Sequence, residues 1–283
     1  MRRAICIFLL FQLMASLAHA QQRHALVIGI GQYEDAAWGR IHGDSDIYYA
    51  VKMLKVNHFN DIITLKNEEA TKKSILSAFD TLQRNCKLGD KVYIQFSGHG
   101  QQVTDVDGDE ENGYDEAWIP YDARPLYKKD VYEGENHLID DEVNRLLSII
   151  KAKIGPSGQI VVVVDACHSG DSTREPGDDA VARGFDEKFE IPKRNPARKE
   201  ALKEDWITIS ACKSHQINWE IAKPSVGKLT WCLYNLRWIL SGLSNDALEE
   251  KIRQIMQENP GPLEQTPDFT GCLGVQQIND LFR

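Results

Sequence analysis

Two hydrophobic runs, each followed three residues later by a reactive side chain, constrain the fold of this chain most strongly. Cys167 follows the run 160–164 in the stretch IVVVVDACHSG, and His99 follows a second β-rich run in VYIQFSGHG. Because 68 positions separate the two side chains, they can meet only if their strands are neighbours in one sheet. A parallel sheet whose strands end at the same edge would bring them together.

A cysteine and a histidine at one edge are typical of nucleophilic catalysis. A thiol is a weak nucleophile until it loses its proton, and a neighbouring imidazole can accept that proton or stabilise the thiolate. His168 is a competing base, but it follows Cys167 directly, and adjacent residues leaving a strand tend to point apart. We expect Cys167 to be the nucleophile and His99 the base. A buried cysteine that serves only packing is the alternative.

The rest of the chain alternates between predicted strands and helices. We expect strands at 24–30, 62–65, 91–96, 117–119, 159–164 and 206–210, and helices at 45–54, 71–84, 139–153, 229–240 and 248–257. A polar loop is expected before the strand at 117–119. This order predicts an α/β fold with a mostly parallel central sheet and helices on both faces.

The first 20 residues carry the pattern of a secretory signal peptide. Arg2 and Arg3 precede an apolar stretch that ends in the small-residue pattern AHA, and the stretch is too short for a membrane-spanning helix. We therefore expect export to the periplasm or the medium, and one mature domain over residues 21–283. No later segment is apolar and long enough to cross a bilayer. The short signal and the single-domain layout favour a bacterial source.

The net charge limits the classes of binding partner, and the cysteine content bears on disulfides and zinc. The formal charge of −9 becomes −11 once the two arginines of the signal are removed, which disfavours nucleic acid and anionic membranes but suits a cationic substrate. The mature chain keeps five cysteines, an odd number that leaves at least one free thiol, and no CxxC pair indicates zinc. Disulfides or plain burial both stay open for the other four, Cys86, Cys212, Cys232 and Cys272.

A charged segment at 171–205 interrupts the alternation of strands and helices. It holds three prolines and few apolar residues, and we expect a long flexible linker with a role in function or processing. An inert surface insertion is the alternative. Exposed basic residues are expected at Arg174, Arg183, Lys193, Arg194 and Arg198.

Three motifs together resemble the caspase-like cysteine peptidases, and within them the metacaspase-like branch. They are SGHG at 97–100, DGDEENGYDEAWIPYD at 107–122 and DACHSG at 165–170. ISAC, followed by Gln216 and Glu220, matches the strand that opens the family's small-subunit portion. The resemblance implies a caspase-haemoglobinase fold with a large-subunit-like part at 21–170, the linker, and a small-subunit-like part at 206–283.

The resemblance also implies a cysteine endopeptidase that works through a thioester. His99 and Cys167 match the family's catalytic dyad, and the backbone of Gly100 and of Cys167 matches its oxyanion-hole donors. No cofactor is required for that chemistry. An enzyme that cuts after basic residues beside its own basic linker is expected to process itself, with Arg183 and Arg198 as the first candidates.

Specificity for Arg or Lys before the cleaved bond is what the metacaspase-like branch implies. Its pocket is acidic, whereas animal caspases accept Asp through arginines. Asp46 and Asp165 match the acidic positions, Ser97 matches a further pocket position, and Gly43 stands where some members have cysteine. Two carboxylates in one cavity would hold a guanidinium by charge-assisted hydrogen bonds. The alternative is that both acids merely cap a loop and a helix.

The acidic block after the histidine motif raises the question of calcium. An EF-hand is disfavoured, because Glu110 stands where glycine is needed and a strand precedes the block. The resemblance implies a different calcium site, in which Asp115, Asp140 and Asp141 match three ligands while Arg174 replaces the fourth. A solvated acidic loop with a capped helix is the alternative.

Other functions remain as alternatives. A catalytically silent caspase-like scaffold would be expected to lack the nucleophile or the base, and both are present. A peptidase with Asp specificity would need arginines at the pocket positions. A serine hydrolase or a phosphate-binding protein is disfavoured, since the chain lacks GxSxG and a glycine-rich phosphate loop.

Overall fold

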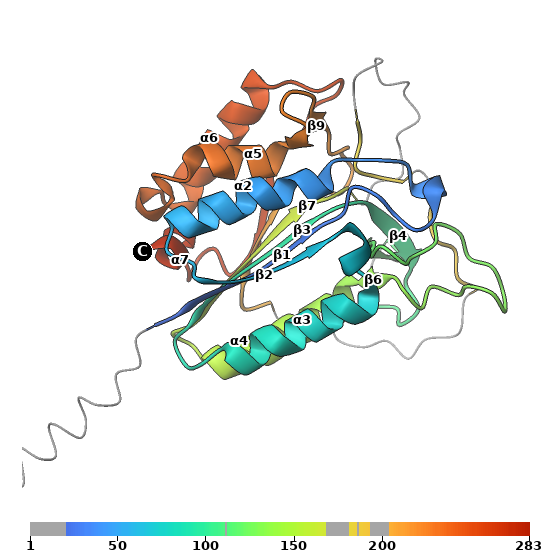
Figure 1. Ribbon diagram of the computed structural model, residues 1–283, viewed down its shortest axis with the longest axis horizontal. Coiled ribbons are helices and arrows are strands. Elements are labelled where there is room, and N and C mark those ends of the chain that lie inside the picture. Colours follow the sequence, from blue (N-terminus) through green and yellow to red (C-terminus); the bar gives the residue numbers. More distant parts are fainter. Residues whose placement is uncertain (1–20, 111, 168–180, 186, 193–203) are drawn as a thin grey trace, which may run out of the picture.

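A six-stranded sheet forms the centre of the computed structural model, which describes residues 21–110, 112–167, 181–185, 187–192 and 204–283 (Figure 1). The strand order is β11-β8-β7-β3-β1-β2, and all neighbours are parallel except β11, which runs antiparallel to β8. The strands are β1 (Arg23–Gly29), β2 (Asp61–Lys66), β3 (Lys91–Ser97), β7 (Gln159–Asp165), β8 (Ile207–Ser210) and β11 (Asp268–Gly271).

Helices cover both faces of this sheet, which confirms the predicted α/β class (Figure 1). One face carries α2 (Gly43–Val56), α5 (Lys228–Leu236), α6 (Asn245–Glu258) and α7 (Ile278–Phe282), and the other carries α3 (Lys72–Asn85) and α4 (Asp140–Ile154). Short 3-10 helices lie at Ala36–Trp38, Asn67–Glu69 and Leu240–Gly242. The helix predicted at 229–240 therefore ends early, at Leu236.

The burial of the two central strands, β3 and β7, explains why both are clear hydrophobic runs in the sequence. Every residue of β3 and β7 is buried. Tyr93 and Val161 enter the core beneath α2 and α5, whereas Ile94 and Val162 enter the core beneath α3 and α4. A strand covered on both faces needs apolar side chains on both, so it is an unbroken hydrophobic run in the sequence.

Two small sheets flank the main one. The first contains β4 (Gly100–Thr104), β5 (Tyr114–Trp118) and β6 (Leu138–Ile139), and the second pairs β9 (Glu220–Ile221) with β10 (Val226–Gly227). β4 lies where a polar loop was predicted, so that prediction is wrong there. Its buried Gln101 is satisfied internally, because the side-chain amide donates to Pro125 O at 2.9 Å and the amide oxygen lies 2.9 Å from His137 Nε2.

The described part of the linker is packed against the domain. Arg183 and Phe189 are both fully buried. Phe189 pairs with Val103 of β4, and its backbone N–H donates to Gln102 O at 2.8 Å. The prediction of an exposed Arg183 is therefore wrong, because acidic partners far away in the sequence enclose it. The other basic linker residues, Arg174, Lys193, Arg194 and Arg198, lie outside the described residues.

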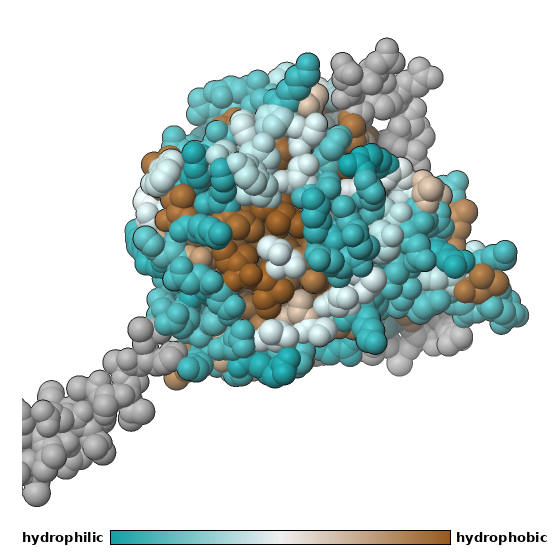
Figure 2. Space-filling view, viewed as in Figure 1, coloured by the Kyte–Doolittle hydropathy of each residue, from teal (hydrophilic) through white to brown (hydrophobic). Residues whose placement is uncertain are grey.

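One face of the molecule exposes part of the core. In Figure 2 apolar side chains gather in the middle of this face, between α2 and α3, where β2 is the last strand of the described sheet. Ile62, Ile63 and Leu65 of β2 are only partly buried. No helix in the described ranges is long and apolar enough to span a membrane. The predicted signal peptide, 1–20, lies outside the described residues.

The cysteines in the described ranges form no disulfide with one another. Cys86, Cys212 and Cys232 are buried, and Cys272 is partly buried. Their environment is that of small hydrophobic residues, which was the alternative to disulfides.

Candidate active site

The sheet register brings the two reactive side chains to one edge, as the sequence predicted. Ser97 at the end of β3 pairs with Asp165 at the end of β7. His99 and Cys167 each follow two residues later. Adjacent parallel strands therefore release the imidazole and the thiol at the same carboxyl edge.

His99 lies in an aromatic cage. Its ring centroid is 5.2 Å from that of Tyr33 and 5.8 Å from that of Trp38, and its backbone N–H donates to the Tyr33 hydroxyl at 2.7 Å. Burial lowers the pKa of His99 to about 4, although the nearby backbone of Gly39 and Gly184 opposes part of this shift. Neither ring nitrogen makes a hydrogen bond of normal geometry within the described chain. The imidazole is therefore neutral near pH 7, the form that accepts a proton.

Cys167 is fully buried beside a second thiol. Its Sγ donates to Gln216 O at 3.2 Å, and the Sγ of Cys212 donates to the same carbonyl at 3.4 Å. A hydrogen bond to Cys167, with burial, raises the pKa of Cys212 well above its usual range. The His99 ring makes no hydrogen bond of normal geometry to this thiol.

An acidic pocket beside Cys167 is filled by the chain's own Arg183. Its Nη1 donates to Asp46 Oδ2 at 2.6 Å and to the Asp165 carbonyl at 3.0 Å, and its Nη2 lies 3.1 Å from Asp46 Oδ1. Its Nε donates to Glu220 Oε1 at 2.9 Å. The side chains of Arg183, Asp46 and Asp165 are 0% exposed. Three carboxylates thus surround one guanidinium away from water.

The electrostatics of this pocket depend on the guanidinium. Burial raises the pKa of Asp46 to about 6, while attraction to Arg183 lowers it and Asp165 raises it further. Burial lowers the pKa of Arg183, but attraction to the three acids outweighs it and leaves that pKa well above its usual value. An empty pocket would leave these acids buried without their cation, which is costly.

Val181 and Ala182, the described residues before Arg183, pair with the segment 218–220 beside the pocket. Arg183 N donates to Asn218 O at 2.9 Å, and Glu220 N donates to Val181 O at 2.9 Å. Ala182 forms an antiparallel bridge with Trp219 between these two hydrogen bonds. Peptide segments that add a strand to a protein edge are bound in this way.

The peptide bond after Arg183 lies against the nucleophile. The backbone N–H of Cys167 donates to the carbonyl oxygen of Arg183 at 2.9 Å. Gly184 forms a parallel bridge with Gly100, so both predicted oxyanion-hole residues adjoin the same peptide bond. An amide held this way is polarised at its carbonyl, which is the geometry that acyl transfer to a thiol requires.

Comparison with known proteins places the chain in a family. Residues 22–275 match the family described as caspase domain. The chain belongs to the caspase domain family. Metacaspase-1 of Botryotinia fuckeliana and metacaspase-1A of Aspergillus niger are each 31% identical to it over 159 residues, which is 53% of this chain and 35% and 36% of theirs. The alignment thus spans about a third of the length of these relatives.

Solved structures share the caspase-family fold of this chain. Caspase-1 from Spodoptera frugiperda superimposes with a TM-score of 0.58 at 11% identity, covering 89% of this chain and 87% of that one. A protein from Geobacter sulfurreducens gives a TM-score of 0.62 at 23% identity, covering 88% of this chain and 92% of that one.

The predicted pocket residues of this caspase-family chain fall into two layers. Asp46 and Asp165 contact the guanidinium directly. Ser97 lies behind them, because its hydroxyl accepts from Gln95, whose amide also donates to Thr230. Gly43 provides close packing, since a Cβ there would lie 2.5 Å from the carbonyl oxygens of both Ile30 and Ser97.

Sequence reasoning missed two residues of the pocket. Glu220 was noted only for its place in the family's small-subunit motif, yet it contacts the guanidinium. Thr230 joins the two aspartates, with its hydroxyl 3.1 Å from Asp46 Oδ2 and 2.7 Å from Asp165 Oδ2. The only available signal was an acid placed between the apolar residues Trp219 and Ile221, a setting that indicates a buried carboxylate.

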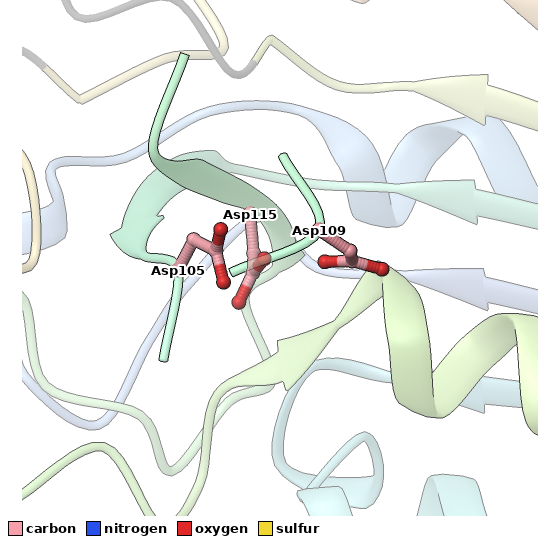
Figure 3. A group of neighbouring side chains, drawn as sticks. All are labelled: Asp105, Asp109 and Asp115. Carbon is pink, nitrogen blue, oxygen red and sulfur yellow. The ribbon is translucent and has the colours of Figure 1, made fainter. Parts of the chain in front are cut away.

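A second acidic cluster lies on β5 and the loop before it. Carboxylate oxygens of Asp105, Asp109 and Asp115 lie within 4.8 Å of one another (Figure 3). Those of Asp107, Asp109 and Asp141, the last on α4, form a neighbouring group. Burial raises the pKa of Asp115 to about 8, with further contributions from Asp140, Asp105, Asp141 and Asp107. Of the predicted ligands, Asp115 and Asp141 belong to these groups, while Asp140 acts on Asp115 through its charge.

Proposed function

We propose that this chain is a cysteine endopeptidase that hydrolyses peptide bonds after basic residues through His99 and Cys167. One observation carries the proposal: the segment 181–184 lies in the site as a substrate would. Its arginine fills the acidic pocket, and the carbonyl of that arginine accepts from the Cys167 amide.

Each residue of the site would have a distinct role in the reaction. The Cys167 thiol passes its proton to neutral His99 and attacks the carbonyl carbon, while the amides of Cys167 and Gly100 stabilise the negative oxygen. His99 then protonates the departing amine, and its ring lies near the backbone of Gly184, the residue that would leave. Water hydrolyses the thioester and regenerates the thiol.

Self-processing is part of this proposal. The peptide bond between Arg183 and Gly184 is the first bond that the site would meet, because it is already positioned. The second candidate, Arg198, lies outside the described residues. Before the cut the linker would block other substrates, so the chain would be made as a latent enzyme.

Calcium is proposed as an activator, since the acidic cluster around Asp115 offers the oxygen donors that Ca²⁺ prefers. Asp115 is 3% exposed and lies among other carboxylates. Asp105, Asp109 and Asp115 would hold the ion, with Asp140 and Asp141 nearby, and the ion would relieve their mutual repulsion. The natural partner is a peptide or protein with Arg or Lys before the cleaved bond, met after export through the signal peptide.

The proposal is tested by measuring hydrolysis of matched fluorogenic peptides ending in Arg, Lys or Asp. The proteins compared are the full chain without its signal and the Cys167→Ala and His99→Ala variants of that chain. Mass spectrometry of the same preparations locates any self-cleavage. We expect cleavage after basic residues and a cut after Arg183, both abolished in the two variants. Cleavage only after Asp would contradict the acidic pocket, and no cleavage with or without calcium would favour the silent scaffold.

A further inference from the structure

Three acids line the pocket, but they contact different parts of the guanidinium. Asp46 accepts from both terminal nitrogens of Arg183, at 2.6 and 3.1 Å. Glu220 accepts from the inner nitrogen, Nε, at 2.9 Å. With the hydrogen bond from Nη1 to the Asp165 carbonyl at 3.0 Å, four donor contacts fix one planar group. The carboxylate of Glu220 contacts Nε, an atom that lysine lacks.

Glu220 is held by contacts that do not involve the guanidinium. Its side chain is 2% exposed. Its Oε1 accepts from the His42 backbone N–H at 2.7 Å, and its Oε2 lies 2.5 Å from His42 Nδ1. His42 directly precedes α2, the helix that carries Asp46. Both acids are thus positioned by the same end of one helix, and Glu220 cannot turn to follow a different ligand without losing these contacts.

A lysine in this pocket would have one nitrogen for two separate tasks. Its ammonium is a single point at the end of an apolar stem, so it cannot face Asp46 at the pocket's end and also donate to Glu220 in the way that Nε does. The hydrogen bond to Glu220 is between charged groups, and one such bond changes an equilibrium by a factor of about 10 to 100.

We propose that Glu220 makes the enzyme prefer Arg to Lys before the cleaved bond, and that His42 is the positioning residue that orients it. The inference rests on the proposed function, because it assumes that a substrate arginine takes the place of Arg183. It adds a preference for Arg over Lys, which the two aspartates alone do not give, since they would attract either cation.

The test compares kcat/KM for matched Arg and Lys peptides in the full chain lacking its signal, in Glu220→Met, which keeps the length of the side chain without an acceptor, and in Asp46→Asn. We expect the wild-type chain to prefer Arg by about 10- to 100-fold. Glu220→Met should lower Arg cleavage far more than Lys cleavage, so that the ratio approaches one. Asp46→Asn should lower both. The ratio is unaffected by how often the linker occupies the pocket, since both peptides compete with the same linker.

Two further variants separate orientation from folding. Glu220→Gln keeps one acceptor and should retain an intermediate ratio, and His42→Ala should lower the ratio as well, although a purely structural loss would reduce both activities together. Lys cleavage by each preparation shows that the variant is folded. An unchanged ratio in Glu220→Met, or a wild-type chain that cuts both peptides equally, would overturn the inference and leave basic specificity intact. A wild-type chain that cuts neither peptide would instead refute the proposed function.

Discussion

Replacing Arg183 with alanine should destabilise the whole domain, although the residue belongs to a charged linker. Arg183 is fully buried and contacts Asp46, Asp165 and Glu220. Its removal leaves three buried carboxylates without their cation. Breaking a buried charge network by removing one partner costs about 3 to 5 kcal/mol.

This free energy can be converted to a melting temperature. In a domain of about 260 residues, 1 kcal/mol shifts the midpoint by roughly 2–4 °C, so Arg183→Ala should melt about 6–20 °C lower. The comparison is made by calorimetry in the Cys167→Ala background, so that self-cleavage does not alter the sample. Arg253→Ala is the matched control, because Arg253 pairs with Glu249 on a half-exposed helix face and such pairs contribute at most about 1 kcal/mol.

A rescue experiment ties the loss to the pocket. Methylguanidine should raise the melting temperature of Arg183→Ala and leave that of the parent nearly unchanged, since only the variant has a vacant acidic pocket. A variant that melts within about 2 °C of its parent would refute the reasoning, because 3 kcal/mol corresponds to at least about 6 °C. The buried network would then contribute nothing to stability.

Three further predictions follow from the site and its supports. Self-cleavage, followed by gel densitometry, should slow about tenfold between pH 7 and pH 5. Asp46, with a pKa of about 6, then loses the charge that holds Arg183, while His99, with a pKa of about 4, stays neutral. A flat rate over this range would contradict this role of Asp46. Calcium should raise the melting temperature of the chain and fail to do so in Asp115→Asn, with chelator as the control. Equal shifts in both proteins would show that the ion does not bind at this cluster. Gly43→Ala should lower the melting temperature, since its Cβ would lie 2.5 Å from two carbonyl oxygens, whereas Gly242→Ala, where nothing lies within 4 Å, should not.

The sequence was sufficient to predict the central sheet and the placement of His99 and Cys167 at the same edge of it. β3 and β7 are continuous hydrophobic runs because both faces are covered, and that pattern is local. β4 escaped prediction, because its sequence GQQVT has no alternation of apolar and polar residues. Its Gln101 is buried by partners as distant as Pro125 and His137, which no local pattern contains.

The burial of Arg183 was beyond sequence reasoning for the same reason. An arginine amid acids, prolines and other basic residues has the composition of a solvated linker. Its partners come from α2, β7 and β9, and its hydrogen bonds to Asp46 span 137 positions. The aspartates could be matched one at a time, but their joint enclosure of a cation belongs to the tertiary structure.

The linker is held on both sides of the bond between Arg183 and Gly184, and this separates cutting from release. Before the bond, Val181 and Arg183 are hydrogen-bonded along 218–220, and beyond it Phe189 is buried against β4. A nick would create a new carboxyl terminus with its side chain still in the pocket and a new amino terminus still anchored by an aromatic ring. The nicked protein would inhibit itself as a bound product does, so the appearance of activity should lag behind the appearance of fragments.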